Sequence, residues 1–154
     1  MRGEDEEDVH EQQRTSGVLS TPPLVFLADD DEVLRLVLKE ELLAHGYAVE
    51  DVGDGAQALE LLSMAADGLA SVPNVVILDV RMPGYSGLGV LNVMRRFARR
   101  PPTVLLTGVP DPSIDVLGRT LGAYRVLHKP VELCAVLEAV RDAASSMLAR
   151  SNGA

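Results

Sequence analysis

The 154-residue chain is poor in aromatic residues and in cysteine. It has no tryptophan, two phenylalanines, three tyrosines and a single cysteine, Cys134. One cysteine excludes an internal disulfide and is typical of a reducing compartment; we expect it to be a small buried apolar residue on the last predicted helix. Leucine, valine and alanine supply most of the 47% hydrophobic content. That composition favours a parallel sheet covered by helices with small side chains.

Two further absences limit where the chain acts and what it binds. No apolar stretch approaches the roughly 20 residues of a membrane span, and the N-terminus is acidic, unlike a basic signal peptide. The net charge of -9 argues against direct nucleic-acid binding, which needs clustered cations. The one basic cluster, residues 95–100, is typical of the solvated C-terminal end of a helix. We therefore expect a cytoplasmic protein with neither membrane nor nucleic acid as a partner.

The length fits one folded domain with tails. Residues 1–21 contain six acids and no hydrophobic periodicity, which predicts a disordered acidic tail. Two prolines mark the start of the fold, and residues 22–150 are expected to form the domain. Residues 151–154 are expected to be a short tail. The Met1 start and this short tail favour a free-standing protein.

Hydrophobic runs alternate five times with helical patterns. Most of the runs are apolar on both faces, which indicates buried parallel strands. The second run alternates in part, as an edge strand does. The expected strands are residues 24–28, 47–52, 75–78, 103–106 and 125–128. The expected helices lie near residues 31–45, 87–97, 113–121 and 131–149, and a further one, after the turn at Asp54, contains Ala56, Leu59 and Leu62. This order predicts an α/β fold, (βα)5, with a doubly wound parallel sheet and helices on both faces.

Polar residues stand at the carboxyl ends of four of these strands. Residues 29–31 are three aspartates after the first strand, Asp79 follows the third, Thr107 the fourth and Lys129 the fifth. Any one could be ordinary: Asp31 is expected to cap the next helix, and the others could serve turns or the surface. Ligands of open parallel sheets bind beyond the carboxyl ends of the strands. We therefore expect these groups to converge on one site, where carboxylates suit Mg²⁺.

With these residues in place, the chain resembles a receiver domain of two-component response regulators (CheY-like or FixJ-like) over roughly residues 23–149. The resemblance implies a flavodoxin-like sheet with strand order 2-1-3-4-5. The matching segments are residues 26–32 (FLADDDE), 77–88 (ILDVRMPGYSGL), 105–108 (LLTG), 122–123 (GA) and 128–130 (HKP).

The resemblance also implies roles for single residues. It makes Asp79 the phosphoacceptor. Asp30, Asp79 and the backbone carbonyl of Arg81 would ligate Mg²⁺, and Asp29 would act largely through water. Thr107 would hydrogen-bond one phosphoryl oxygen and Lys129 would pair with another. Phosphoryl transfer requires mainly positioning and charge neutralisation, which such a set of groups supplies.

One position departs from the family pattern. Receivers usually carry an aromatic residue two before the position of His128, and it rotates inward when the threonine moves. Here that residue is Val126, so the aromatic half of the switch is missing or replaced. Tyr124 falls on the same face by strand alternation and is a weak substitute. The small residue expected after the threonine is present as Gly108.

The leading hypothesis is a single-domain response regulator. It would accept a phosphoryl group from a histidine kinase or phosphotransfer protein and then signal by protein contact or phosphorelay. The downstream protein is unidentified; the face around the fourth helix and fifth strand would contact it, as a monomer or a phosphorylation-dependent homodimer. No enzymatic activity is expected beyond self-phosphorylation from a phosphodonor and autodephosphorylation.

Two other hypotheses stay open. A pseudo-receiver would be a constitutive protein-interaction module, which Val126 favours and the intact acids oppose. An aspartate-nucleophile phosphatase needs a second acid two residues after the nucleophile, where this chain has Arg81.

Overall fold

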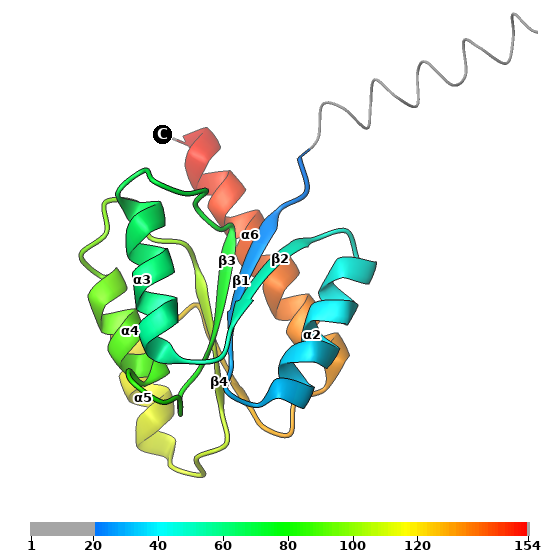
Figure 1. Cartoon of the computed structure of the whole chain (residues 1–154), viewed down its shortest axis with the longest axis vertical. Helices are drawn as coiled ribbons and strands as arrows, with labels where there is room; N and C mark the ends of the chain where they lie inside the picture. Colours follow the sequence, from blue (N-terminus) through cyan, green and yellow to red (C-terminus); the bar gives the residue numbers. More distant parts are fainter. Residues whose placement is uncertain (1–20, 154) are drawn as a thin grey trace, which may run out of the picture.

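Five parallel strands form one sheet, in the order β2-β1-β3-β4-β5 (Figure 1). A computed structural model describes residues 21–153, so the expected acidic tail lies outside the described residues except for its last position. The strands are β1 (Leu24–Ala28), β2 (Ala48–Val52), β3 (Val75–Asp79), β4 (Thr103–Thr107) and β5 (Arg125–His128). The predicted flavodoxin-like α/β fold and its strand order are confirmed.

Helices cover both faces of the sheet. They are α2 (Glu32–Ala44), α3 (Gly55–Ala66), α4 (Gly87–Met94), α5 (Pro112–Thr120) and α6 (Leu133–Gly153). One face packs against α2 and α6, and the other against α3, α4 and α5 (Figure 1). The carboxyl ends of all five strands therefore meet at one open edge, between these two helical layers.

The apolar runs owe their composition to this double cover. Along β1, Val25 and Leu27 enter the core beside α2 and α6, whereas Phe26 and Ala28 enter the other core. Both sets are at most 2% exposed. By contrast, β2 lies at the sheet edge and none of its residues is fully buried. Strands buried on both faces lose the polar alternation of half-exposed ones.

Side chains at the helix ends explain where several elements begin and stop. Asp31, as expected, accepts hydrogen bonds from two backbone amides in the first turn of α2, and Asp54 and Asp111 each accept one in the first turn of α3 and α5. Gly46 has φ of +90° just after α2, the left-handed conformation that glycine adopts without steric cost. These caps fix the entry of each helix relative to the strand before it.

Two helix ends differ from expectation. The predicted helix near 87–97 stops at Met94, because the chain tightens there into a turn in which the Phe97 amide donates to the Met94 carbonyl. The last helix begins at Leu133 and continues to Gly153, so it takes in three of the four residues expected as a tail.

The expectation of a buried cysteine was wrong. Cys134 lies on α6 but is exposed, with its Sγ 3.6 Å from a carboxylate oxygen of Glu132. The side of α6 that packs on the sheet carries Val136, Ala139 and Val140. Cys134 precedes Val136 by two positions, about 200° around a helix, so it faces solvent.

Candidate functional site

The structure brings the predicted acids together at the carboxyl edge of the sheet. Asp79 is the last residue of β3, and Asp29 and Asp30 follow β1 directly. Carboxylate oxygens of these three residues lie within 4.8 Å of one another. Asp29 and Asp79 are buried, at 0% and 4% exposure, whereas Asp30 is exposed. The cluster thus has a buried floor and one side open to solvent.

Lys129 lies between the two buried carboxylates. Its Nζ is 3.1 Å from Oδ2 of Asp29 and 3.2 Å from Oδ2 of Asp79. The lysine follows β5, and its backbone amide donates to the carbonyl of Thr107 at 2.7 Å, which extends the β4–β5 pairing. One ammonium therefore compensates two negative charges that burial would otherwise make costly.

Burial and charge shift the acid–base behaviour of this pair. Burial raises the pKa of Asp79 to about 7, and the negative charge of Asp29 acts in the same direction. The Lys129 ammonium lowers the pKa of Asp79 but only in part offsets this. Burial opposes the charged form of Lys129, yet the two carboxylates raise its pKa above the ordinary value. The acid at the centre of the site therefore changes charge near neutral pH.

The chemistry of this donor set fits a hard divalent cation. Oδ2 of Asp29 is buried and has no well-aligned hydrogen bond among the described residues, so its contact with the Lys129 ammonium is an ion pair without hydrogen-bond geometry. Oδ1 of Asp29 accepts from the Asp31 amide at 2.9 Å. Mg²⁺ binds to carboxylate oxygens in part-hydrated sites of this kind.

Thr107 lies at the same edge of the sheet, and its hydroxyl is hydrogen-bonded within the loop that follows β4. The residue is 1% exposed, and its Oγ1 accepts a hydrogen bond from the Val109 amide at 3.1 Å. The Val109 carbonyl in turn accepts from the amide of Asp111, the residue that caps α5. The threonine hydroxyl is therefore connected through two hydrogen bonds to the start of α5. Gly108 leaves the site open on this side.

Two glycines fix the loop between β3 and α4. A Cβ on Gly87 would lie 2.2 Å from the backbone oxygen of Asp79, and one on Gly55 would lie 1.8 Å from that of Tyr85. The Gly55 amide also donates to the Pro83 carbonyl at 3.0 Å. The chain that includes Arg81 is thus held close to Asp79 by backbone contacts. The role of the Arg81 carbonyl as a ligand stays a prediction.

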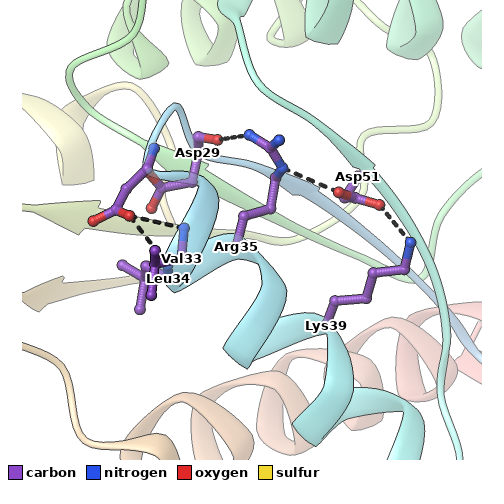
Figure 2. A network of polar contacts seen from close by, with 7 residues as sticks. Asp29, Val33, Leu34, Arg35, Lys39 and Asp51 are labelled. Carbon is purple, nitrogen blue, oxygen red and sulfur yellow. Dashed lines mark hydrogen bonds and ion pairs between the residues drawn. The ribbon is translucent and has the colours of Figure 1, made fainter.

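Sequence reasoning missed Arg35. Figure 2 shows its guanidinium between Asp29 and Asp51: Nη1 donates to the backbone oxygen of Asp29 at 2.6 Å, and Nε to Oδ2 of Asp51 at 3.1 Å. Lys39, one turn further along α2, pairs with the other oxygen of Asp51 at 2.8 Å. The only sequence signal was the i, i+4 spacing of two cations on one helix face.

The position of the missing aromatic residue is filled by close packing. Val126 is 9% exposed, and a Cβ on Gly118 of α5 would be 3.4 Å from Val126 Cγ2 and 2.7 Å from Leu105 Cδ1. Glycine therefore lets α5 approach the sheet where an aromatic side chain would need space. Tyr124 does not replace that residue: its amide pairs with Thr103, the first residue of β4, at the opposite end of the strand from Thr107.

A polar contact ties α5 to β5, because His128 Nε2 lies 2.8 Å from Oδ2 of Asp115. At the start of β5, the guanidinium of Arg125 lies 5.6 Å from the centre of the ring of its neighbour Tyr124.

Over residues 21–153, no helix is both long enough and apolar enough to cross a membrane.

Comparison with known proteins agrees with this geometry. Residues 25–141 match the response regulator receiver domain family. The response regulator MprA of Mycolicibacterium vanbaalenii is 34% identical over 120 residues, which cover 78% of this chain and 49% of that protein. The chain thus spans about half the length of that relative.

Solved structures show the same fold. The signal receiver domain of an HD domain-containing protein from Pseudomonas fluorescens Pf-5 superposes with a TM-score of 0.76 at 27% identity, over 87% of this chain and 95% of that one. A CheY-like receiver domain protein from Methanospirillum hungatei gives a TM-score of 0.75 at 19% identity, over 84% of this chain and 99% of that one. The chain therefore belongs to the response regulator receiver domain family of two-component signalling.

Proposed function

We propose that the chain, through a receiver domain at residues 22–150, is a phosphorylatable switch whose phosphoacceptor is Asp79. The observation that carries this proposal is the position of Lys129, whose ammonium lies within 3.2 Å of both buried carboxylates. A carboxylate nucleophile beside a fixed cation, at an edge open to solvent through Asp30, suits the transfer of a phosphoryl group.

The donor would be a phosphohistidine of a histidine kinase or phosphotransfer protein. An oxygen of the Asp79 carboxylate attacks phosphorus as the phosphorus–nitrogen bond breaks, and the imidazole keeps the electron pair and takes up a proton. Lys129 then pairs with a phosphoryl oxygen in place of one carboxylate. Water later attacks the phosphorus of the acyl phosphate, the bond between phosphorus and the Asp79 oxygen breaks, and inorganic phosphate leaves with the carboxylate regenerated. We propose no other catalytic activity.

Asp29, Asp30, Asp79 and the Arg81 carbonyl would hold Mg²⁺, which supplies neutralisation of the phosphoryl charge when bound. The burial of each acid suits the role that we propose for it. Asp79 is buried and nucleophilic, whereas the exposed Asp30 is open to a hydrated ion. Asp29 accepts a backbone hydrogen bond and so stays oriented towards the cluster.

The output of the switch would begin at Thr107. Its hydroxyl accepts from the Val109 amide, and a rotation of the side chain that carries the hydroxyl to a phosphoryl oxygen would take it away from that amide. The Val109 amide would then be unpaired, which favours a new arrangement of the loop that leads into α5. Exposed apolar residues on α5, Val116 at 66% and Leu117 at 44%, would contact an unidentified downstream protein or a second, phosphorylated copy.

A constitutive interaction module is the second candidate, and one observation favours it. Gly118 and Val126 pack so closely that α5 has no space beneath it for a rotating aromatic side chain. A receiver that cannot move α5 would bind its partner in one fixed state. This candidate predicts that the acidic site takes up no phosphoryl group, or takes one up without effect on α5.

The test is incubation with acetyl phosphate and Mg²⁺, followed by intact mass measurement. One added phosphoryl group is expected in the wild type and none in Asp79→Asn. Beryllofluoride is the second probe, because it mimics an aspartyl phosphate without a donor protein; it should change amide shifts in α5. Absence of both the adduct and beryllofluoride binding would overturn the switch, and binding without any change in α5 would favour the fixed module.

A further inference from the structure

We propose that Arg35 is a positioning residue for the metal-binding acids, and that the contact through which it acts is its hydrogen bond to the backbone of Asp29. This inference rests on the proposed function, because it assigns a residue to the Mg²⁺ site of that switch. Within residues 21–153, the contact of Arg35 with these acids is to the Asp29 backbone and not to a carboxylate of Asp29, Asp30 or Asp79.

The first argument is the bond that the guanidinium makes. Nη1 of Arg35 donates to the backbone oxygen of Asp29 at 2.6 Å, a short distance for a nitrogen donor and typical of charge-assisted bonds. That carbonyl belongs to the peptide group that joins Asp29 to Asp30. Since the peptide group is planar, fixing its oxygen restricts the backbone directions from which both acidic side chains leave.

The second argument is that the remaining bonds of Asp29 leave this carbonyl to Arg35. The Asp29 amide donates to Val52 at 3.2 Å, and Oδ1 accepts from Asp31 at 2.9 Å. The residue is thus tied to β2 at its amide and to the start of α2 at its side chain. Without Arg35, the peptide group between the two acids could rotate, although both flanking contacts would persist.

The third argument is the anchor of the guanidinium itself. Nε of Arg35 donates to Asp51 of β2 at 3.1 Å (Figure 2), and a Cβ at Gly53 would lie 2.8 Å from Nη1. Glycine at this position leaves space for the guanidinium beside the β2–α3 loop. The arginine therefore reaches two acceptors from two different nitrogens, Nε and Nη1, a fork that the single nitrogen of a lysine lacks.

A purely structural ion pair is the competing explanation. Partly exposed pairs contribute little to stability, and the side chains of Arg35 and Asp51 are 20% and 24% exposed. Lys39 provides the comparison within the same network: it pairs with Asp51 at 2.8 Å and, unlike Arg35, has no hydrogen bond to Asp29 in the described part of the chain. Lys39 therefore separates the pair with Asp51, which both cations make, from the bond to the Asp29 backbone, which Arg35 makes.

The experiment is a Mg²⁺ titration of the full ¹⁵N-labelled chain without phosphodonor, read as a dissociation constant from amide shifts near the acids. Arg35→Ala and Arg35→Lys are expected to weaken Mg²⁺ binding about tenfold or more, the lower end of the effect of groups that orient metal ligands. Lys39→Met, the matched control, should stay within about twofold of the wild type. Thermal unfolding without metal reports the stability of each variant separately.

The outcomes are distinct. Wild-type affinity in folded Arg35→Lys, or an equal loss in Lys39→Met, would overturn the positioning role and leave the proposed function intact. If Arg35→Ala does not fold, Arg35→Lys decides the matter alone, because it keeps the charge and the aliphatic stem. A wild type that shows no Mg²⁺-dependent shift would instead overturn the proposed function, and this inference with it.

Discussion

At the scale of single residues, one ammonium, that of Lys129, has to compensate two buried carboxylates. The pKa of the central acid follows from its burial and from this imbalance of charge. Asp29 and Asp79 are both within 3.2 Å of the ammonium, and Asp79 is 4% exposed. Two like charges at short range cannot both be fully stabilised by one cation. The consequence is an acid whose protonation, and therefore whose effect on folding, changes across neutral pH.

The first prediction concerns stability against pH in metal-free protein. Burial raises the pKa of Asp79 from 3.8 to about 7, so the folded protein holds a proton that the unfolded chain has already lost. Asp79 therefore contributes stability that is fully present below pH 3.8 and is lost as pH rises through about 7. Relative to Asp79→Asn, the wild type should lose on the order of a few kcal/mol between about pH 5 and about pH 8.

Urea unfolding of both proteins in the presence of a chelator measures this difference. The side-chain amide introduced by Asp79→Asn does not titrate. The pH dependence of the variant's stability therefore reports the other titratable groups, and its difference from the wild type reports Asp79. A free-energy difference between the two proteins that stays constant across this pH range would contradict the assignment of the titration to Asp79.

At the scale of secondary-structure elements, glycine determines how closely α4 approaches Asp79. Gly87 and Gly89 lie two residues apart on the same helix. A Cβ at Gly87 would meet the backbone oxygen of Asp79 at 2.2 Å, whereas one at Gly89 would lie 3.5 Å from Ser86 Oγ and 4.0 Å from Tyr85 Cδ1. The first contact involves backbone that cannot move aside, and the other two are at ordinary van der Waals distances.

The second prediction uses this pair. Gly87→Ala should destabilise the protein by roughly 1–3 kcal/mol or more, the cost of forcing atoms into a packed region. Gly89→Ala should stabilise it by about 0.5–1 kcal/mol, because alanine loses less conformational entropy in a helix. Denaturant unfolding of the two variants measures both. Stabilisation of both variants would show that helix propensity, and not the approach to Asp79, determines the effect.

Local signals explain why the elements were predictable from sequence. Apolar runs, capping aspartates such as Asp31, and Gly46 after the helix each act within a few residues, so they could be read without a structure. The convergence of Asp79 and Lys129 also followed, because parallel strands end at one edge. The cysteine was predicted wrongly since residue type was weighed above helical phase: Cys134 lies about 200° from Val136 around α6.

Contacts to backbone atoms were not predictable in this way. The acceptor of Arg35 is the carbonyl of Asp29, and every residue has a carbonyl, so the sequence does not indicate which one a guanidinium reaches. The close approach of Gly118 to Val126 likewise depends on the position of α5 over the sheet. Both features arise from packing between segments that are distant in sequence, and both affect how the site works.

At the scale of the whole molecule, the helices differ in how many of their residues are buried. In α4, four of eight residues are buried, whereas in the nine-residue α5 the only buried one is Gly118. A glycine contributes almost no apolar side-chain area, so α5 gains little from burial. Its apolar residue Ile114 is half-buried, and its polar ties include the cap by Asp111 and the pair between His128 and Asp115. The helix that follows Thr107 is therefore held least firmly by the core.

The third prediction follows from this difference and is measured by native-state hydrogen exchange. Amides of β1, β3 and β4, whose residues are almost all buried, should exchange only through global unfolding, so low concentrations of urea should accelerate them. Amides of α5 should exchange through local opening, with protection at least about tenfold below that of α4 and little urea dependence. Equal protection in α4 and α5 would mean that α5 unfolds only with the core, and a helix so coupled could not respond to Thr107 by itself. Low protection confined to α5 would instead identify α5 as the mobile element. Hydrogen bonds connect Thr107 through Val109 to Asp111, which caps this helix.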